Sequence, residues 1–160
     1  MNSMKNVVVA SLLATPLLLT NVNAGNYNLE ATEGKGIGTI KLEKAKNFGW
    51  WTGNGSGASW TVNISESGKA QLSAMLSKPG EKPCGDLKAL LNGKEISVIP
   101  VNGTGGWNNY KSFSFGEVDL PKGRNTISVV VENTKGGYFA NMKGLKLKSK
   151  ELKLTIVKPD

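Results

Sequence analysis

The stretch Leu87–Val101, LKALLNGKEISVIPV, carries the clearest fold signal in the chain, because two apolar runs are joined by Asn92-Gly93. Both residues of an Asn-Gly pair tolerate the positive φ angles that a tight turn between antiparallel strands requires. The stretch therefore predicts a β-hairpin, with one strand over 87–91 and the other over 95–101.

Alternation of apolar and polar residues continues on both sides of this hairpin. Ala58, Trp60, Val62 and Ile64 alternate with polar residues, so we expect a strand with one buried and one solvent-exposed face. Trp60 is therefore expected in the core and not in a functional site. The other predicted strands cover 27–31, 37–42, 70–76, 113–120, 127–131, 145–147 and 152–156.

The number and spacing of these strands indicate the fold class. No segment shows the spacing of an amphipathic helix, and turn residues recur at short intervals. About nine or ten strands in one all-β domain fit an antiparallel β-sandwich of two sheets. A closed barrel is the alternative.

The N-terminal residues have the pattern of a signal peptide. Lys5 precedes an apolar run over 7–19, and Val22-Asn23-Ala24 provides small residues at the spacing that a signal peptidase recognises. The run is shorter than the roughly 20 apolar residues of a membrane span. The sequence therefore predicts a signal peptide over 1–24, cleavage after Ala24, export to the periplasm or the medium, and one domain over 25–160.

The chain is basic, with a formal net charge of +8 and an isoelectric point near 9.6. This charge permits an anionic partner such as an acidic polysaccharide. The lysines near the C-terminus alternate with leucines, and we interpret them as a solvated strand face that discourages edge-to-edge pairing, not as a nucleic-acid groove. These lysines are Lys146, Lys148, Lys150 and Lys153.

The composition argues against catalysis. The chain contains no histidine, which removes the usual general base and most zinc sites, and its single cysteine, Cys84, cannot form an internal disulfide. Glu117 and Asp119 would project from one face of a strand, at a separation compatible with a glycosidase pair. We interpret them instead as solvent-facing residues, and expect neither enzymatic activity nor a cofactor.

The glycine-rich segment Val101–Phe115, VNGTGGWNNYKSFSF, contains candidate binding residues. Its glycines permit turn conformations, so we expect Trp107 at the crest of a loop and exposed to solvent. A flat ring beside amide groups suits a sugar, whose C–H face is apolar and whose hydroxyls form hydrogen bonds. Asn108 and Tyr110 are neighbouring candidates.

Short motifs along the chain occur in the order seen in a known family. The motifs are Gly49-Trp50-Trp51, Ala58-Ser59-Trp60-Thr61-Val62, Ser67-Gly68, Leu91-Asn92-Gly93, Gly105-Gly106-Trp107, Val118-Asp119-Leu120-Pro121-Lys122-Gly123-Arg124-Asn125, and Asn141 before Leu145. With them, the chain resembles carbohydrate-binding modules of the galactose-binding-like β-sandwich type, of families six and thirty-five, and the C-terminal modules of bacterial fucosidases and sulfatases. The resemblance covers nearly all of 25–160 and implies a jelly-roll sandwich.

The resemblance also implies a site at the loops on one end of the sandwich. The motif positions nominate Trp50, Trp107 and Asn141 as sugar-binding residues, and Trp51 and Tyr110 are adjacent candidates. Many modules of this type hold a structural calcium through an acidic pair in the first strand and an aspartate after the asparagine. Here Glu30 and Glu33 match that pair only loosely, and Lys143 stands at the aspartate position, which argues against calcium.

Two functions from different classes follow from these observations. The first is an exported, non-catalytic module that binds a polysaccharide or glycan by stacking a sugar ring on tryptophans. The second is a protein-interaction or surface-assembly module that keeps the sandwich without a working sugar site.

Overall fold

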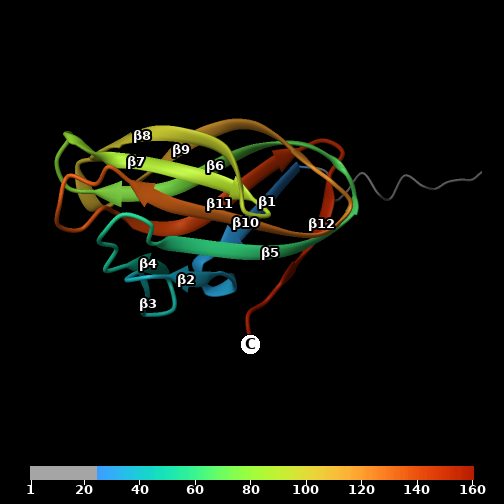
Figure 1. Cartoon of the computed structure of the whole chain (residues 1–160), viewed down its shortest axis with the longest axis horizontal. Coiled ribbons are helices and arrows are strands. Elements are labelled where there is room, and N and C mark those ends of the chain that lie inside the picture. The colour runs from blue at the N-terminus through green and yellow to red at the C-terminus, as the bar shows by residue number, and fades with distance from the viewer. Residues whose placement is uncertain (1–24) are drawn as a thin grey trace, which may run out of the picture.

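Two six-stranded antiparallel sheets form the protein in the computed structural model, which describes residues 25–160 (Figure 1). One sheet has the order β3-β4-β11-β6-β9, with β1 paired to β11, and the other has the order β12-β5-β10-β7-β8, with β2 paired to β5. The all-β sandwich is confirmed, and the closed barrel is wrong because the strands form two separate sheets. The predicted signal peptide over 1–24 lies outside the described residues.

The first sheet contains β1 (Gly25–Glu30), β3 (Lys41–Glu43), β4 (Asn47–Gly49), β6 (Gly68–Lys78), β9 (Gly106–Leu120) and β11 (Asn141–Ser149). The second contains β2 (Lys35–Ile37), β5 (Gly57–Glu66), β7 (Pro83–Leu91), β8 (Lys94–Asn102), β10 (Gly123–Glu132) and β12 (Lys153–Val157). A short 3-10 turn, Ala31–Glu33, follows β1. No helix within 25–160 is long and apolar enough to span a bilayer.

The core is made of the inward-facing rows that the alternation predicted. Ala58, Trp60, Val62 and Ile64 of β5 are all buried, and the odd-numbered side chains of β10 from Ile127 to Val131 are buried as well. From the opposite sheet, β6 contributes the even-numbered residues from 70 to 76. These rows pack face to face and exclude water, which is the main favourable contribution to folding.

The hairpin at Asn92-Gly93 has the predicted turn. Asn92 has φ 52° and Gly93 has φ 83°, the left-handed angles of a type I′ turn. The Asn92 side chain also accepts a hydrogen bond from the Thr126 backbone N–H at 2.8 Å. This bond attaches the turn to the neighbouring strand β10.

A β-bulge in β9 changes which residues face the core. Ser114 pairs with Ser73 and Gly116 pairs with Leu72, so Phe115 is an extra residue in β9. Gly116 has φ 88°, a conformation that glycine adopts without strain. The side chains that face the core are therefore the partly buried Phe113 and the buried Phe115 up to the bulge, and the even-numbered Val118 and Leu120 after it.

The expected strand over 37–42 is wrong. The chain turns at Gly38, which has φ 74°, and divides the segment between β2 and β3. Because β2 pairs with β5 and β3 pairs with β4, this segment crosses from one sheet to the other. Such three-residue strands give no alternation to detect. With them, residues 25–160 contain twelve strands, more than the predicted nine or ten.

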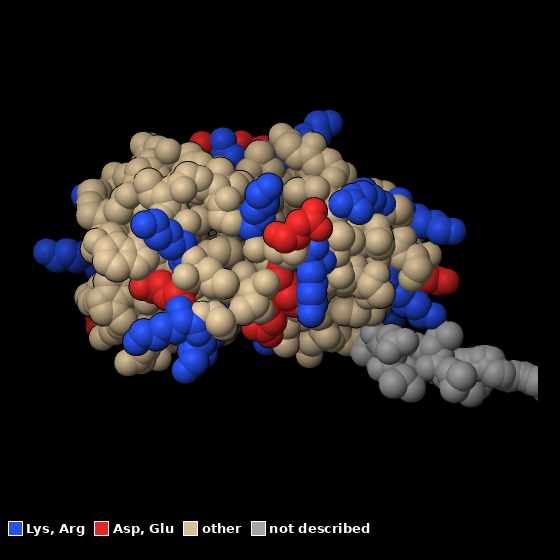
Figure 2. All heavy atoms as spheres, turned by 90° about the horizontal axis from the view of Figure 1, so that it is seen from below, with Lys and Arg blue, Asp and Glu red and all other residues tan. Residues whose placement is uncertain are grey.

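The interpretation of the C-terminal lysines needs a partial correction. Lys146 and Lys148 are on β11, which pairs with β1 and β6 and is not an edge strand, so they do not protect an edge. Lys153 is on β12, an edge strand of the other sheet, where the interpretation holds. Basic and acidic side chains are interspersed on the face shown in Figure 2.

Candidate functional site

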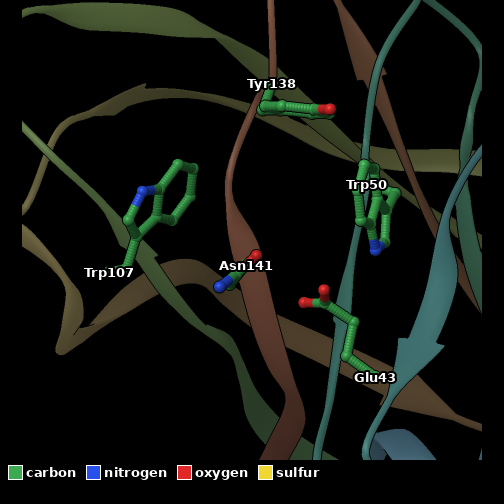
Figure 3. A pocket seen from close by; sticks show the side chains of 5 residues that line it. All are labelled: Glu43, Trp50, Trp107, Tyr138 and Asn141. Carbon is green, nitrogen blue, oxygen red and sulfur yellow. The ribbon is translucent and has the colours of Figure 1, made fainter.

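A pocket of about 310 Å³ lies at the end of the sandwich where β4 ends and β9 and β11 begin. Its lining residues are Glu43, Trp50, Trp107, Tyr138 and Asn141. Figure 3 shows Trp107 and Trp50 on opposite sides, with Asn141 between them. The structure thus brings together the three residues that the family motifs nominated.

Trp50 and Trp51 point in opposite directions from the end of β4. Trp50 is 53% exposed, whereas Trp51 is fully buried and donates its indole N–H to the Ser56 carbonyl at 2.8 Å. Trp50 has φ 55°, a left-handed conformation that is unusual for a bulky residue. The prediction that Trp51 is a sugar-binding candidate is therefore wrong, because its ring is part of the core.

Tyr138 and Phe139 repeat this outward and inward arrangement on the loop before β11. Tyr138 is exposed and meets Trp50 edge to face at 5.6 Å between ring centroids, and buried Phe139 meets Trp51 edge to face at 4.8 Å. The Phe139 N–H donates to the Trp51 carbonyl at 2.7 Å. The two loops are thus joined by a backbone hydrogen bond and two aromatic contacts, which hold one wall of the pocket.

Trp107 is exposed as predicted, but it is the second residue of strand β9 and not the crest of a loop. Its neighbour Gly106 pairs with Lys78, and its own carbonyl accepts a hydrogen bond from the Ser77 hydroxyl at 2.7 Å. The Lys78 ammonium lies 5.4 Å from the centre of the Trp107 ring and donates to the Tyr138 carbonyl. The opposite wall of the pocket is therefore also fixed.

The glycines before Trp107 allow close packing as well as turning. A Cβ atom on Gly103 would lie 2.2 Å from the Gly80 carbonyl oxygen, and Gly105 has φ 98°. The buried Thr104 hydroxyl accepts from the Lys78 N–H at 2.9 Å, and Asn109 donates to the Thr104 carbonyl. This segment is attached to the end of β6 and places the start of β9.

Glu43 and Asn141 are the polar groups of the pocket. A Cβ atom on Gly49 would lie 2.1 Å from the Glu43 Oε1 and 3.0 Å from the Asn141 Oδ1, so the absence of a side chain at Gly49 leaves room for both. Glu43 Oε1 accepts a hydrogen bond from the Asn47 amide at 3.1 Å. A carboxylate and an amide side by side can bind adjacent hydroxyl groups.

Tyr110 supports the site from the neighbouring sheet surface. Burial raises the pKa of its phenol, hydrogen bonds with Ser77 and Asn141 act in the opposite direction, and the negative charge of Glu43 raises it. Tyr110 therefore holds Asn141 without lining the pocket. Asn108 is exposed and is not one of the lining residues.

The residues present do not fit the calcium that the family resemblance implies. Glu33 accepts a hydrogen bond from the Glu30 N–H at 3.1 Å, and the two side chains form a capping box around the 3-10 turn. The Lys143 ammonium lies 4.5 Å from the Tyr110 ring centre, a cation in place of a carboxylate ligand. Within 25–160, no group of three or more His, Cys, Asp or Glu side chains is placed to hold a metal ion.

Glu117 and Asp119 are far along β9 from the pocket. Both are exposed, and Asp119 forms an ion pair with Lys69 at 2.8 Å. Neither residue lines the pocket that contains the tryptophans. Their arrangement agrees with their interpretation as solvent-facing residues.

The sequence reasoning missed two lining residues, Tyr138 and Glu43. Tyr138 follows Gly136-Gly137, the same glycine pair before an aromatic that drew attention to Trp107, so this signal was available. Glu43 follows no such pattern. It reaches the pocket only because the β3–β4 hairpin folds against β11.

The sequence over 23–149 matches the family model of the carbohydrate binding module, family 6. The fold is similar to a family 35 carbohydrate binding module from Clostridium thermocellum, with a TM-score of 0.67 and 19% identity over 78% of this chain and 98% of that chain. It is also similar to a family 35 module from an environmental isolate, with a TM-score of 0.65 and 13% identity over 84% of this chain and 98% of that chain. A third similar structure is a family 35 module (CBM35) from Cellvibrio japonicus, with a TM-score of 0.61 and 17% identity over 84% of this chain and 98% of that chain. No curated protein matches the chain significantly.

At these identities the solved structures establish the shared fold, while the family model covers most of the chain. The matched region contains both tryptophans and the asparagine of the pocket. The chain therefore belongs to the family 6 carbohydrate-binding modules.

Proposed function

We propose that the protein is a non-catalytic module that binds a sugar in the pocket between Trp50 and Trp107. The observation that carries this proposal is that two exposed indole rings face one small pocket whose other groups include an amide and a carboxylate. An indole covers the apolar C–H face of a pyranose, and Asn141 and Glu43 can take hydrogen bonds from its hydroxyls. Tyr138 extends the aromatic wall.

The dimensions of the pocket support a small ligand. Its volume of about 310 Å³ is near the lower end of the range for ligand sites, roughly 300–1,000 Å³. A sugar unit fits such a space, whereas a protein interface normally buries roughly 800 Å² of each partner over a broader surface. The proposal therefore favours glycan binding over the protein-interaction alternative.

The absence of catalysis belongs to the same proposal. Most glycosidases need two carboxyl groups flanking the bond that is cleaved. Glu43 is the one carboxylate among the lining residues of this pocket. Export through the signal peptide over 1–24 is also proposed, because a glycan-binding module acts on sugars outside the cytoplasm.

Binding to a glycan array, followed by affinity electrophoresis in gels containing the polysaccharides that respond, tests the proposal. We expect Trp107→Ala and Trp50→Ala to abolish retention, because each removes one wall of the pocket. Val98→Ala is the matched control, since Val98 is similarly exposed but lies on β8 of the other sheet. Equal retention of wild type and both tryptophan variants, or a stoichiometric protein partner without any glycan response, would contradict the proposal.

A further inference from the structure

The pocket has a single charged side chain among its lining residues. That side chain is the carboxylate of Glu43. Its Oε1 accepts the hydrogen bond from Asn47, and Oε2 has no hydrogen-bond partner within residues 25–160. In Figure 3 the carboxylate points toward the space between Asn141 and Trp50.

Two lysines contact residues of the site, but neither is among the residues that line the pocket. Lys78 donates to the Tyr138 carbonyl and lies beside the Trp107 ring, and Lys143 lies over the Tyr110 ring on the outer face of the sheet. An anionic group that entered the pocket would therefore meet the Glu43 carboxylate without a lysine among the lining residues. Like charges at such short range repel, and partial exclusion of water strengthens the repulsion.

A carboxylate has the opposite effect on hydroxyl groups. When ionised it only accepts hydrogen bonds, and bonds from hydroxyls to a charged acceptor are short and strong. The Asn141 amide lies next to it, because both side chains occupy the space left by Gly49. Two neighbouring hydroxyls of one sugar ring can thus be held together, one by Glu43 and the next by Asn141.

We propose that Glu43 makes this site selective for uncharged sugars with two adjacent hydroxyls, and that it excludes uronic acids and sulfated sugars. The inference rests on the proposed function, since it concerns the same pocket. It adds that one residue, Glu43, determines which class of sugar the pocket binds. The basic net charge of the chain then does not translate into capture of acidic polysaccharide at this site.

Isothermal titration calorimetry with matched sugar pairs tests this inference. The probes are the methyl glycosides of glucose and galactose and those of glucuronic and galacturonic acid, with methyl xyloside as a further neutral sugar. We expect the wild type to bind at least one neutral glycoside and to bind its uronate about tenfold or more weakly. Added salt should narrow this difference by improving uronate binding, because salt screens the repulsion.

The variant Glu43→Gln keeps the size of the side chain and an oxygen for the Asn47 bond but removes the charge. We expect it to lose about five- to tenfold in affinity for the neutral glycoside and to bind the corresponding uronate as well as or better than the wild type does. Glu117→Gln, at the other end of β9, is the matched control and should match the wild type with every probe. Circular dichroism checks that both variants fold.

The outcomes separate the two proposals. If the wild type prefers a uronate and Trp107→Ala abolishes that binding, the sugar site stands and the selectivity assigned to Glu43 is wrong. If Glu43→Gln preferred neutral glycosides over uronates as strongly as the wild type does, the selectivity assigned to Glu43 would also be wrong. If no glycoside and no array glycan binds, both proposals fail.

Discussion

At the residue scale, the site depends on one left-handed residue that separates two tryptophans. Trp50 has φ 55°, which turns its ring outward and directs Trp51 into the core. A non-glycine residue in this conformation costs about 1–2 kcal/mol. The burial of Trp51 and its indole hydrogen bond to Ser56 offset that strain.

Alanine substitution of the two tryptophans is expected to separate binding from stability. Trp51→Ala leaves a cavity in the core and should lower the free energy of unfolding by about 3–5 kcal/mol. Trp50→Ala should change it by less than about 1 kcal/mol while removing sugar binding, since its ring is exposed. Urea denaturation and affinity electrophoresis of both variants measure the two effects. Similar loss of stability in both would contradict the division of roles.

Gly49 can be tested by adding a single methyl group. In Gly49→Ala the new Cβ atom would overlap the Glu43 carboxylate and crowd the Asn141 amide, so both polar groups must move. We expect about tenfold weaker sugar binding. Gly106→Ala is the matched control, because a Cβ atom there meets nothing within 4 Å even though Trp107 is the next residue. Calorimetric titration that shows equal affinity for both variants would argue against the arrangement of Glu43 and Asn141.

The residues of the site differ in how far sequence could predict them. Trp107, Trp50 and Asn141 follow family motifs, and they do line one pocket. Alternation along a strand indicates that Trp50 and Trp51 face opposite sides, but only the φ angle of Trp50 decides which one faces solvent. Glu43 could not be predicted, because no local pattern connects it with residues that are far away in sequence.

At the element scale, the β3–β4 hairpin consists of two strands of three residues each, with the lining residue Glu43 at the end of β3 and Trp50 directly after β4. Its turn is closed by the Lys46 N–H donating to the Glu43 carbonyl at 2.9 Å, with Lys44 at φ 48° and Ala45 at φ 54°. These are the angles of a type I′ turn, in which Asn-Gly is preferred. The hairpin that presents Glu43 and precedes Trp50 is thus held in a strained turn.

Replacing this turn with the preferred residues should stabilise the protein. The double variant Lys44→Asn, Ala45→Gly relieves the strain of two left-handed residues and is expected to raise the free energy of unfolding by about 1 kcal/mol or more. The reverse change at the other type I′ turn, Gly93→Ala, should lower it by about 1 kcal/mol, because only backbone strain opposes it there. Urea denaturation measures both. A double variant less stable than the wild type would contradict this account of the turn.

Strands of five or more residues were predicted at least in part, although the first half of β9 was expected to be a loop, and the strands of three residues were not predicted as separate strands. The hairpin over 87–101 and the strand over 58–64 have enough alternation to define their buried faces. In β9 the bulge at Phe115 shifts the alternation, and Gly116 was the only local sign of it. The segment 35–49 contains three short strands that are defined only by their pairing with other strands. The local sequence pattern therefore could not reveal them.

At the scale of the whole molecule, we expect the packing of the two sheets to provide the stability of the protein. The one cysteine in the chain is buried, and its pKa is raised mainly by burial. Glu30 and Glu33 cap a turn, and Lys143 provides a positive charge where the family would place an aspartate. The core formed by the two sheets is therefore expected to be sufficient for folding.

Removal of calcium tests this expectation. Thermal unfolding curves recorded in EDTA and in millimolar calcium should coincide, because a ligand raises the melting temperature only when it binds the native state. The same comparison with magnesium controls for ionic strength. A melting temperature that rises with calcium but not with magnesium would show that other oxygen atoms form a site.

The link between the two aromatic loops has a consequence for the thermodynamics of recognition. Because Trp51, Phe139 and the backbone bond between them are buried beneath Trp50 and Tyr138, that wall is rigid before a ligand arrives. Association then avoids much of the entropic penalty of ordering loops, which reduces the affinity of flexible receptors. Complex formation should proceed in a single kinetic phase, with no slow rearrangement after encounter.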